Sequence, residues 1–190
     1  MENELGKFEM VVFDTETTGL LMPSNVDVRL QPKIIEFYGV RLDQDFQIIS
    51  ELETFIDPEE PITKEITRIT NIKQSDLDGA PKFGDVAPKI LTLFSGADLS
   101  VAHNLAFDND MVKNCFMMIG NEFPGTKHNL CTVEEYVRNH GHRISLSALY
   151  KKLFGKYFKA HRAKSDVFAL VRCLHQLYED GEINLDIYRH

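Results

Sequence analysis

Residues 10–20 read MVVFDTETTGL, and this stretch gives the strongest indication of the architecture. The run from Phe8 to Phe13 is mostly apolar and β-favouring, which is typical of a strand covered on both faces. Because side chains alternate along a strand, Asp14 and Glu16 project to the same face. The sequence therefore predicts two carboxylates side by side at the end of a buried strand.

Two carboxylates in that position repel one another unless a positive charge lies between them. Hard oxygen ligands of this kind favour Mg²⁺ or Mn²⁺ over softer metals. Thr17, Thr18 and Gly19 follow as a turn, in which Gly19 can adopt a positive φ and let a ligand approach the backbone. The alternative is an exposed edge strand whose acids are simply solvated. The apolar run before the acids and the Thr-Thr-Gly turn after them favour a metal site.

Length and composition fit one domain covering residues 1–190. A hydrophobic content of 43% and a charged content of 26% are ordinary for a globular protein. Residues 1–7 lack the apolar segment of a signal peptide, and no stretch reaches the ~20 apolar residues of a membrane span. The three cysteines are widely spaced, which indicates reduced thiols in the cytoplasm and argues against a disulfide scaffold or a zinc site.

The net charge of −8 is unevenly distributed. Residues 138–164, here called the basic band, contain no Asp or Glu and three histidines. The Lys and Arg residues of the band are Arg138, Arg143, Lys151, Lys152, Lys156, Lys159, Arg162 and Lys164. Such a band can hold a phosphate backbone while the rest of the protein repels it. A solvated helix and loop would fit the same residues equally well.

The chain beyond the first strand predicts an α/β fold. Residues 34–42 and 46–56 are rich in β-branched and aromatic residues and are joined by a short turn, which indicates antiparallel strands. Helices and strands then alternate, which is typical of parallel strands joined by helices. Expected helices cover 63–70, 82–94 (kinked or begun by Pro88), 108–119, 133–140, 145–154 and 163–180, with strands at 99–102 and 129–132 and a loop at 103–107. The prediction is a mixed sheet flanked by helices.

Three further residues can join the acidic pair, because ligands collect at the carboxyl ends of strands in such sheets. Asp108 follows the 99–102 strand, and Asp166 lies in the first turn of the last long helix, five residues after His161. Each has an ordinary alternative role, as a helix N-cap, a partner of the helix dipole and a surface histidine, respectively. The order in which all of them appear favours a shared site.

Three ordered motifs carry a family resemblance: Asp14-x-Glu16, VAHNLAFD at 101–108 and HRAKSD at 161–166. Together they resemble the DEDDh (DnaQ-like) 3′→5′ exonucleases, the group that includes the proofreading subunit of bacterial DNA polymerase III. The resemblance covers about Phe8 to Tyr178 and implies a ribonuclease H-like fold with a five-stranded sheet. One branch of the superfamily carries a tyrosine four residues before the last aspartate; Arg162 stands there, and His161 precedes it, so the histidine branch is indicated.

The resemblance implies a role for each matching residue. Asp14, Glu16, Asp108 and Asp166 would hold two Mg²⁺ or Mn²⁺ ions, about 4 Å apart in such sites. His161 would act as the general base towards water. Cleavage of the terminal phosphodiester would release nucleoside 5′-monophosphates.

The resemblance also implies a set of substrate contacts. The terminal nucleotide would be held by Thr17, Thr18, Ile66, Thr67, His103 and Phe107. Two departures from relatives stand out, Arg68 where a glycine is usual and Lys164-Ser165 before the last aspartate. The first is expected to alter the grip on the base or add a phosphate contact, and the second to tune the surface.

The expected substrate is DNA, at single-stranded 3′ ends. An exoribonuclease is the first alternative, since discrimination depends on contacts to the 2′-hydroxyl. A non-catalytic module that binds 3′ ends is the second. A DNA polymerase is a candidate partner from the resemblance, although the long C-terminal tail by which the proofreading subunit joins its polymerase has no counterpart here. No membrane partner is expected.

Overall fold

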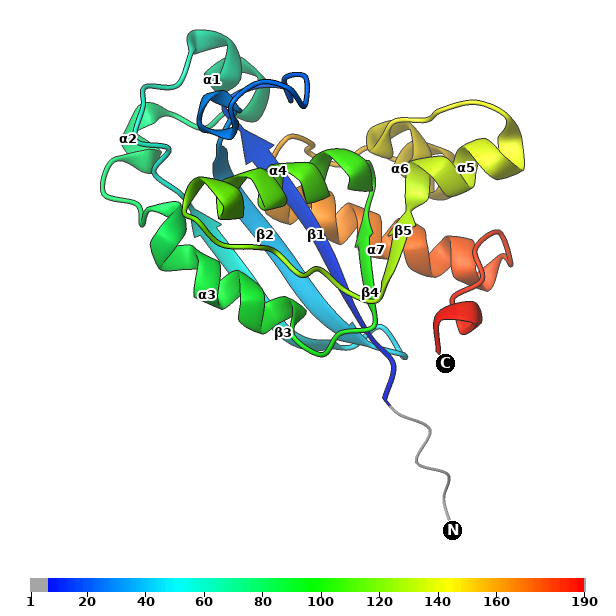
Figure 1. The fold of residues 1–190 in the computed structure, drawn as a ribbon. Coiled ribbons are helices and arrows are strands. Elements are labelled where there is room, and N and C mark those ends of the chain that lie inside the picture. The colour runs from blue at the N-terminus through cyan, green and yellow to red at the C-terminus, as the bar shows by residue number, and fades with distance from the viewer. Residues whose placement is uncertain (1–6, 190) are drawn as a thin grey trace.

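The fold is built on a five-stranded sheet in the order β3-β2-β1-β4-β5 (Figure 1). It comes from a computed structural model that describes residues 7–189. The prediction about a signal peptide in residues 1–7 therefore lies almost wholly outside the described residues. The strands are β1 (Glu9–Thr17), β2 (Ile34–Asp43), β3 (Ile48–Phe55), β4 (Leu99–Ala102) and β5 (His128–Cys131).

Strand directions confirm the predicted mixed sheet. β2 pairs antiparallel with both β1 and β3, whereas β4 pairs parallel with β1 and with β5. Each parallel partner is reached through a helical segment, as crossover connections require. The ribonuclease H-like α/β fold implied by the resemblance is therefore present.

Helices cover both faces of this sheet. They are α1 (Lys64–Thr70), α2 (Gln74–Leu77), α3 (Phe83–Phe94), α4 (Leu105–Met118), α5 (Thr132–His140), α6 (Leu146–Phe154) and α7 (Ala163–Glu179), with 3₁₀ turns at Val28–Leu30 and Asp186–Tyr188. In Figure 1, α3 and α4 lie in front of the sheet and α7 lies behind it. No helix in residues 7–189 is long and apolar enough to cross a membrane.

Three local predictions need correction. β1 does not end at Phe13 but continues through the acids to Thr17, because β2 pairs with it as far as Ile34. α4 begins at Leu105, so most of the expected 103–107 loop is helical and Asp108 lies in the first turn of the helix. Pro88 lies inside α3 and does not mark its start.

Alternation along β1 divides the core in two. Met10 and Val12 pack with α6 and α7 on one face of the sheet. Val11 and Phe13 pack with α3 and α4 on the other face. All four side chains are fully buried, as expected for a central strand covered on both sides. With a period of two, the same register places Asp14 and Glu16 on the α7 face.

Candidate active site

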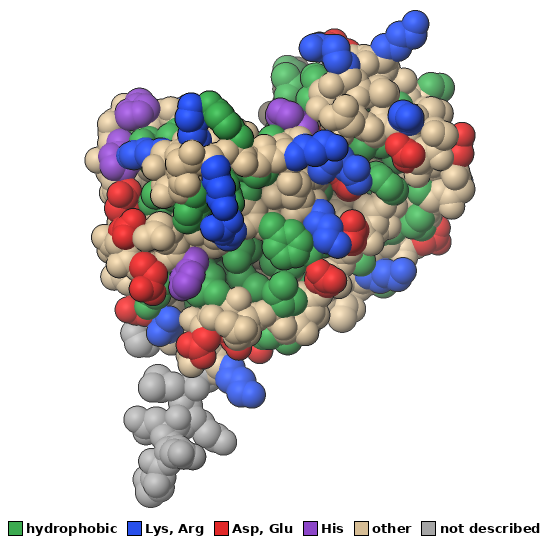
Figure 2. Space-filling model, turned by 180° about the vertical axis from the view of Figure 1, so that it is seen from behind, with side chains coloured by type: hydrophobic (Ala, Val, Ile, Leu, Met, Phe, Trp, Pro, Cys, Tyr) green, Lys and Arg blue, Asp and Glu red, His purple; other side chains and the backbone are tan. Residues whose placement is uncertain are grey.

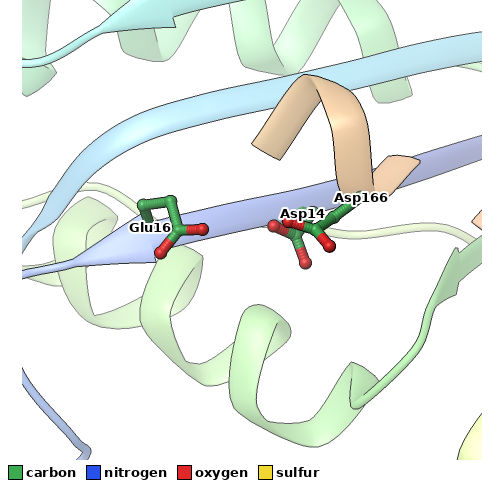
Figure 3. A group of neighbouring side chains, drawn as sticks. All are labelled: Asp14, Glu16 and Asp166. Carbon is green, nitrogen blue, oxygen red and sulfur yellow. The ribbon is translucent and has the colours of Figure 1, made fainter. Parts of the chain in front are cut away.

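Three carboxylates meet at the carboxyl end of β1. One oxygen from each of Asp14, Glu16 and Asp166 lies within 4.8 Å of the others. Figure 3 shows the first two side chains on β1 and Asp166 reaching them from the start of α7. A cluster of carboxylate oxygens at this spacing suits a hard divalent cation. The geometry thus joins two of the three sequence motifs.

Asp108 lies beside this cluster but is not among its three members. It is buried in the first turn of α4, with 4% of its surface exposed. Its Oδ1 accepts hydrogen bonds from the backbone N–H (3.1 Å) and the hydroxyl (2.8 Å) of Thr15. Its charge raises the pKa of both Asp14 and Glu16. Asp108 is thus held against β1 at Thr15, between the two acids in sequence, and its part in a metal site stays a prediction.

The acids strongly perturb one another. Burial, followed by the charges of Asp108 and Asp166, raises the pKa of Asp14 well above its ordinary value. Burial, with Asp166 next, raises the pKa of Glu16 to about 8. The pKa of Asp166 rises to about 6, again mainly through burial. Carrying full negative charge at neutral pH is therefore unfavourable in the protein alone, and divalent cations would relieve this repulsion.

His161 lies directly before α7 in an uncommon backbone conformation. Its φ is +65°, in the left-handed region that favours glycine, and its side chain is exposed. His161 directly precedes Arg162, the N-cap of α7, and so lies at the same helix start as Asp166. The hydrogen bond from the Arg162 backbone and then the charge of His161 oppose the rise that burial causes in the pKa of Asp166. The neighbouring Arg162 N–H donates to Asp166 Oδ2 at 3.0 Å. Left-handed non-glycine residues often lie at functional sites.

Among the predicted substrate residues, the polar side chains of His103, Thr17 and Thr18 are already hydrogen-bonded within the protein. Both ring nitrogens of His103 are within hydrogen-bond distance of protein groups, Nδ1 with Thr132 Oγ1 (2.9 Å) and Nε2 with the Ile144 carbonyl (3.0 Å). The Thr17 hydroxyl donates to the Gly19 carbonyl (2.7 Å), while Thr18 Oγ1 accepts from the backbone of Lys33 (3.0 Å).

Apolar side chains of the predicted substrate set pack partly into the protein. Ile66, on α1, packs against a small cluster that includes Ile35, and Phe107 packs against the core beneath α4. Thr67 is half-buried on α1. The substrate roles of all six residues remain predictions.

The helix α1 also clarifies the missing glycine. Arg68 lies inside the helix, where no special backbone conformation is needed. Asn71, the C-cap of α1, is left-handed with φ +59°, and is the position that suits a glycine. Asparagine tolerates this conformation better than most residues. The structure therefore gives no conformational reason for a glycine at position 68, and the left-handed conformation in this segment falls on Asn71.

Sequence reasoning missed Glu36 and Thr15. Glu36 is 2% exposed and forms an ion pair with Arg162. The available signal was a single acid in the otherwise apolar IIEFYGV run. In the sequence Thr15 is marked only by its place between Asp14 and Glu16, whereas its N–H and hydroxyl both bind Asp108.

The basic band covers α6, the end of α5 and the loop before α7. Lys151, Lys156 and Lys159 are exposed, and Tyr157 between them has 68% of its surface exposed. Other members are paired: Arg162 with Glu36 and Lys164 with Glu53. Figure 2 shows Lys and Arg side chains gathered in the upper part of the rear face, beside a notch in its upper edge.

Known proteins resemble this chain in sequence and in fold. An exonuclease family model (RNase T) matches residues 11–174. The PolC-type DNA polymerase III of Clostridium perfringens is 31% identical over 180 residues, which are 95% of this chain but only 12% of that polymerase.

Solved structures of nucleases share the fold of this chain. Exonuclease X in complex with 5′ overhanging duplex DNA is 26% identical, with a TM-score of 0.67 over 90% of this chain and 93% of that one. The nuclease domain of 3′hExo, a DEDDh family member bound to rAMP, is 17% identical but superimposes with a TM-score of 0.76 over 94% and 96% of the two chains. With the ordered motifs and the matching fold, these similarities show that the chain belongs to the DnaQ-like, DEDDh family of 3′→5′ exonucleases.

Proposed function

We propose that this protein is a metal-dependent 3′→5′ exonuclease that removes nucleoside 5′-monophosphates from the 3′ ends of DNA. The observation that carries the proposal is the convergence of Asp14, Glu16 and Asp166 within 4.8 Å, beside His161. These carboxylates, with Asp108, would hold two Mg²⁺ or Mn²⁺ ions. Such ions supply electrostatic stabilisation of the attacking and leaving oxygens during in-line displacement at phosphorus.

The chain's own residues supply the proton transfer and the positioning. His161, which is exposed, takes a proton from the attacking water as the P–O3′ bond to the leaving strand breaks, and the freed 3′ oxygen takes up a proton from solvent to become a 3′-hydroxyl. The released nucleotide keeps the phosphate on its 5′ oxygen. Thr17, Thr18 and Phe107, which lie around the same strand ends, would hold the terminal nucleotide.

The basic band supports binding of a phosphate backbone. Its exposed lysines and Tyr157 lie in the segment that leads into His161. Each phosphate contact releases counterions, so affinity should fall by orders of magnitude between about 50 and 200 mM salt. A flat response to salt would instead indicate a solvated surface.

DNA is proposed over RNA because PolC-type DNA polymerases are among the relatives. We further propose one exonuclease domain over the whole chain, a cytoplasmic location, and action beside a DNA polymerase in replication or repair. The chain spans only about 12% of the length of the PolC relative, so the proposal concerns the exonuclease activity of this region and not that of a whole polymerase.

End-labelled oligonucleotides test the function directly. Single-stranded and duplex DNA, and RNA of the same sequence, would be incubated with the protein and Mn²⁺ or Mg²⁺, and the products separated by size. The expected result is a ladder that shortens from the 3′ end, with nucleoside 5′-monophosphates released and EDTA blocking the reaction. Faster digestion of RNA would identify an exoribonuclease. Intact oligonucleotides that still bind the protein would identify a binding module.

A further inference from the structure

We propose that Glu36, acting through Arg162, is a positioning residue that sets the geometry of His161 and Asp166 for catalysis. The inference rests on the proposed function, because its effect is on turnover. Neither Glu36 nor Arg162 is needed here to touch the nucleic acid or a metal ion. Their contacts instead join β2 to the start of α7.

The location of Glu36 requires a partner. In the β1–β2 register it lies directly opposite Glu16, and its side chain is 2% exposed. Like charges directly opposite one another in an antiparallel pair are unfavourable, and burial of a lone carboxylate is costly. Glu36 also raises the pKa of Glu16, Asp14 and Asp166. A buried acid beside a metal cluster is tolerated only if its own charge is satisfied.

Two side-chain nitrogens of Arg162 pair with the Glu36 carboxylate. Its Nε lies 3.1 Å from each Glu36 carboxylate oxygen, and its Nη2 lies 2.7 Å from Oε1. The backbone N–H of Ala163, the first residue of α7, donates to Oε2 at 3.1 Å. The oxygens of Glu36 are thus committed to protein donors. Glu36 consequently holds the first turn of α7 instead of joining the acidic cluster.

The contact between Glu36 and Arg162 restrains both Asp166 and His161. Arg162 donates its own N–H to Asp166 Oδ2 at 3.0 Å, so one residue joins Glu36 to the cluster. His161, immediately before it, is left-handed with φ +65°. Such a conformation persists only where the surroundings fix it, and the anchored Arg162 provides that restraint.

The fork of arginine is needed for this geometry. The guanidinium lies 5.3 Å from the centre of the Phe55 ring while it contacts Glu36. A lysine carries one nitrogen, which cannot match two oxygens from a fixed plane. Arg162→Lys therefore keeps the charge but loses the restraint.

A second ion pair at the same helix start provides a matched control. Lys164, two residues after Arg162, pairs with Glu53 on β3. The side chains of that pair are 42% and 47% exposed, against 2% for Glu36. Exposed pairs contribute little, and no described contact leads from Glu53 to His161. The charge of Glu53 acts weakly on Arg162, but Glu53 takes no part in the hydrogen bonds between Glu36 and the start of α7. Glu53→Gln thus removes an acid paired with α7 and leaves those hydrogen bonds in place.

The test measures kcat and KM for a single-stranded DNA oligonucleotide with saturating Mn²⁺, well below the unfolding temperature of each variant. Glu36→Gln and Arg162→Lys should each lower kcat by roughly ten- to a hundredfold, as small misplacements of catalytic groups do. KM should stay within about twofold, because substrate contacts are elsewhere. Glu53→Gln should leave both constants unchanged.

The outcomes separate the two proposals. Wild-type protein that digests no oligonucleotide refutes the proposed function itself. An active wild type with an unchanged kcat in Arg162→Lys, which keeps its charge and is the milder change, overturns the positioning role. Loss of kcat in Glu53→Gln to the same degree overturns it too, since any ion pair at this helix would then suffice. A Glu36→Gln/Arg162→Lys double variant no slower than the slower single variant supports action as one unit.

Discussion

The two ends of β1 handle charge in opposite ways. At the amino end, Glu9 is paired with Arg41, and the Glu9 N–H donates to Asp98 Oδ2 at 3.0 Å. At the carboxyl end, Asp14 and Glu16 form a cluster with Asp166, and burial, followed by the charges of neighbouring acids, raises the pKa of each of the two. One end of the strand is neutralised by the protein itself. The other end keeps an excess of negative charge that favours cation binding at a cost in stability.

The largest effect is expected from the carboxyl end. Asp14→Asn replaces one carboxylate ligand while preserving shape, and should lower turnover by more than about 100-fold, since loss of an outer-shell partner of a metal site already costs about 10- to 100-fold. Release of labelled nucleotide under single-turnover conditions measures it. Near-normal turnover in this variant would remove the acidic cluster from the mechanism.

Loss of the proton acceptor should come next. His161→Ala should reduce turnover by about 100-fold, at the lower end of the effect of a general base, while Mn²⁺ binding persists. Calorimetric titration with Mn²⁺ alone checks the second point. If turnover is unchanged, another group takes the proton from water.

The raised pKa values at the carboxyl end of β1 also predict an unusual dependence of stability on pH. Its carboxyls hold protons to higher pH in the folded chain than in the unfolded one, so their contribution favours folding at low pH. In metal-free protein that contribution should be lost as pH rises through the folded pKa values, about 6 for Asp166 and about 8 for Glu16.

Thermal unfolding in EDTA between pH 5.5 and 8.5 measures this loss. The unfolding temperature should fall over that range, Mg²⁺ should restore it, and Asp14→Asn should flatten the curve by removing one repelling charge. A metal-free protein whose stability rises steadily with pH would contradict the predicted repulsion.

The smallest functional effect is expected at the balanced end. Glu9→Gln breaks a partly buried pair with Arg41, whose side chains are 20% and 16% exposed, and should cost about 1 kcal/mol of unfolding free energy. Turnover should not change, because no catalytic group lies there. Urea denaturation and the nuclease assay together check both statements. A Glu9→Gln variant with reduced turnover would break the contrast between the two ends.

The sequence predicted the elements governed by local pattern. The apolar run before Asp14 predicts β1. Val167, Leu170 and Leu174 recur at helical spacing, and α7 ends within one residue of the end expected for the 163–180 helix. The period of two correctly placed Asp14 and Glu16 together. Asp166 joins them because α7 packs against β1.

What the sequence did not predict depends on contacts between distant residues. Glu36 looked like one polar residue in an apolar strand, since its partner lies 126 residues away. The left-handed backbone at His161 could not be inferred, because histidine, although enriched there among non-glycine residues, adopts this conformation only where surrounding contacts fix it. The start of α4 at Leu105, before the predicted start at Asp108, was also not predicted, because the side chain of the N-cap Asn104 makes no capping hydrogen bond and so gives no clear start signal.

The short length of β4 has a consequence for the architecture of this site. β4 pairs with β1 only as far as Val12, opposite Val101, and then the chain turns into α4. The N–H of Thr15, further along the same strand, donates to the Asp108 side chain. A helix thus takes over the edge that a neighbouring strand leaves vacant, and it brings an acid to that edge. If β4 were one residue pair longer, its backbone would occupy this space, and the Asp108 carboxylate could not reach the N–H of Thr15.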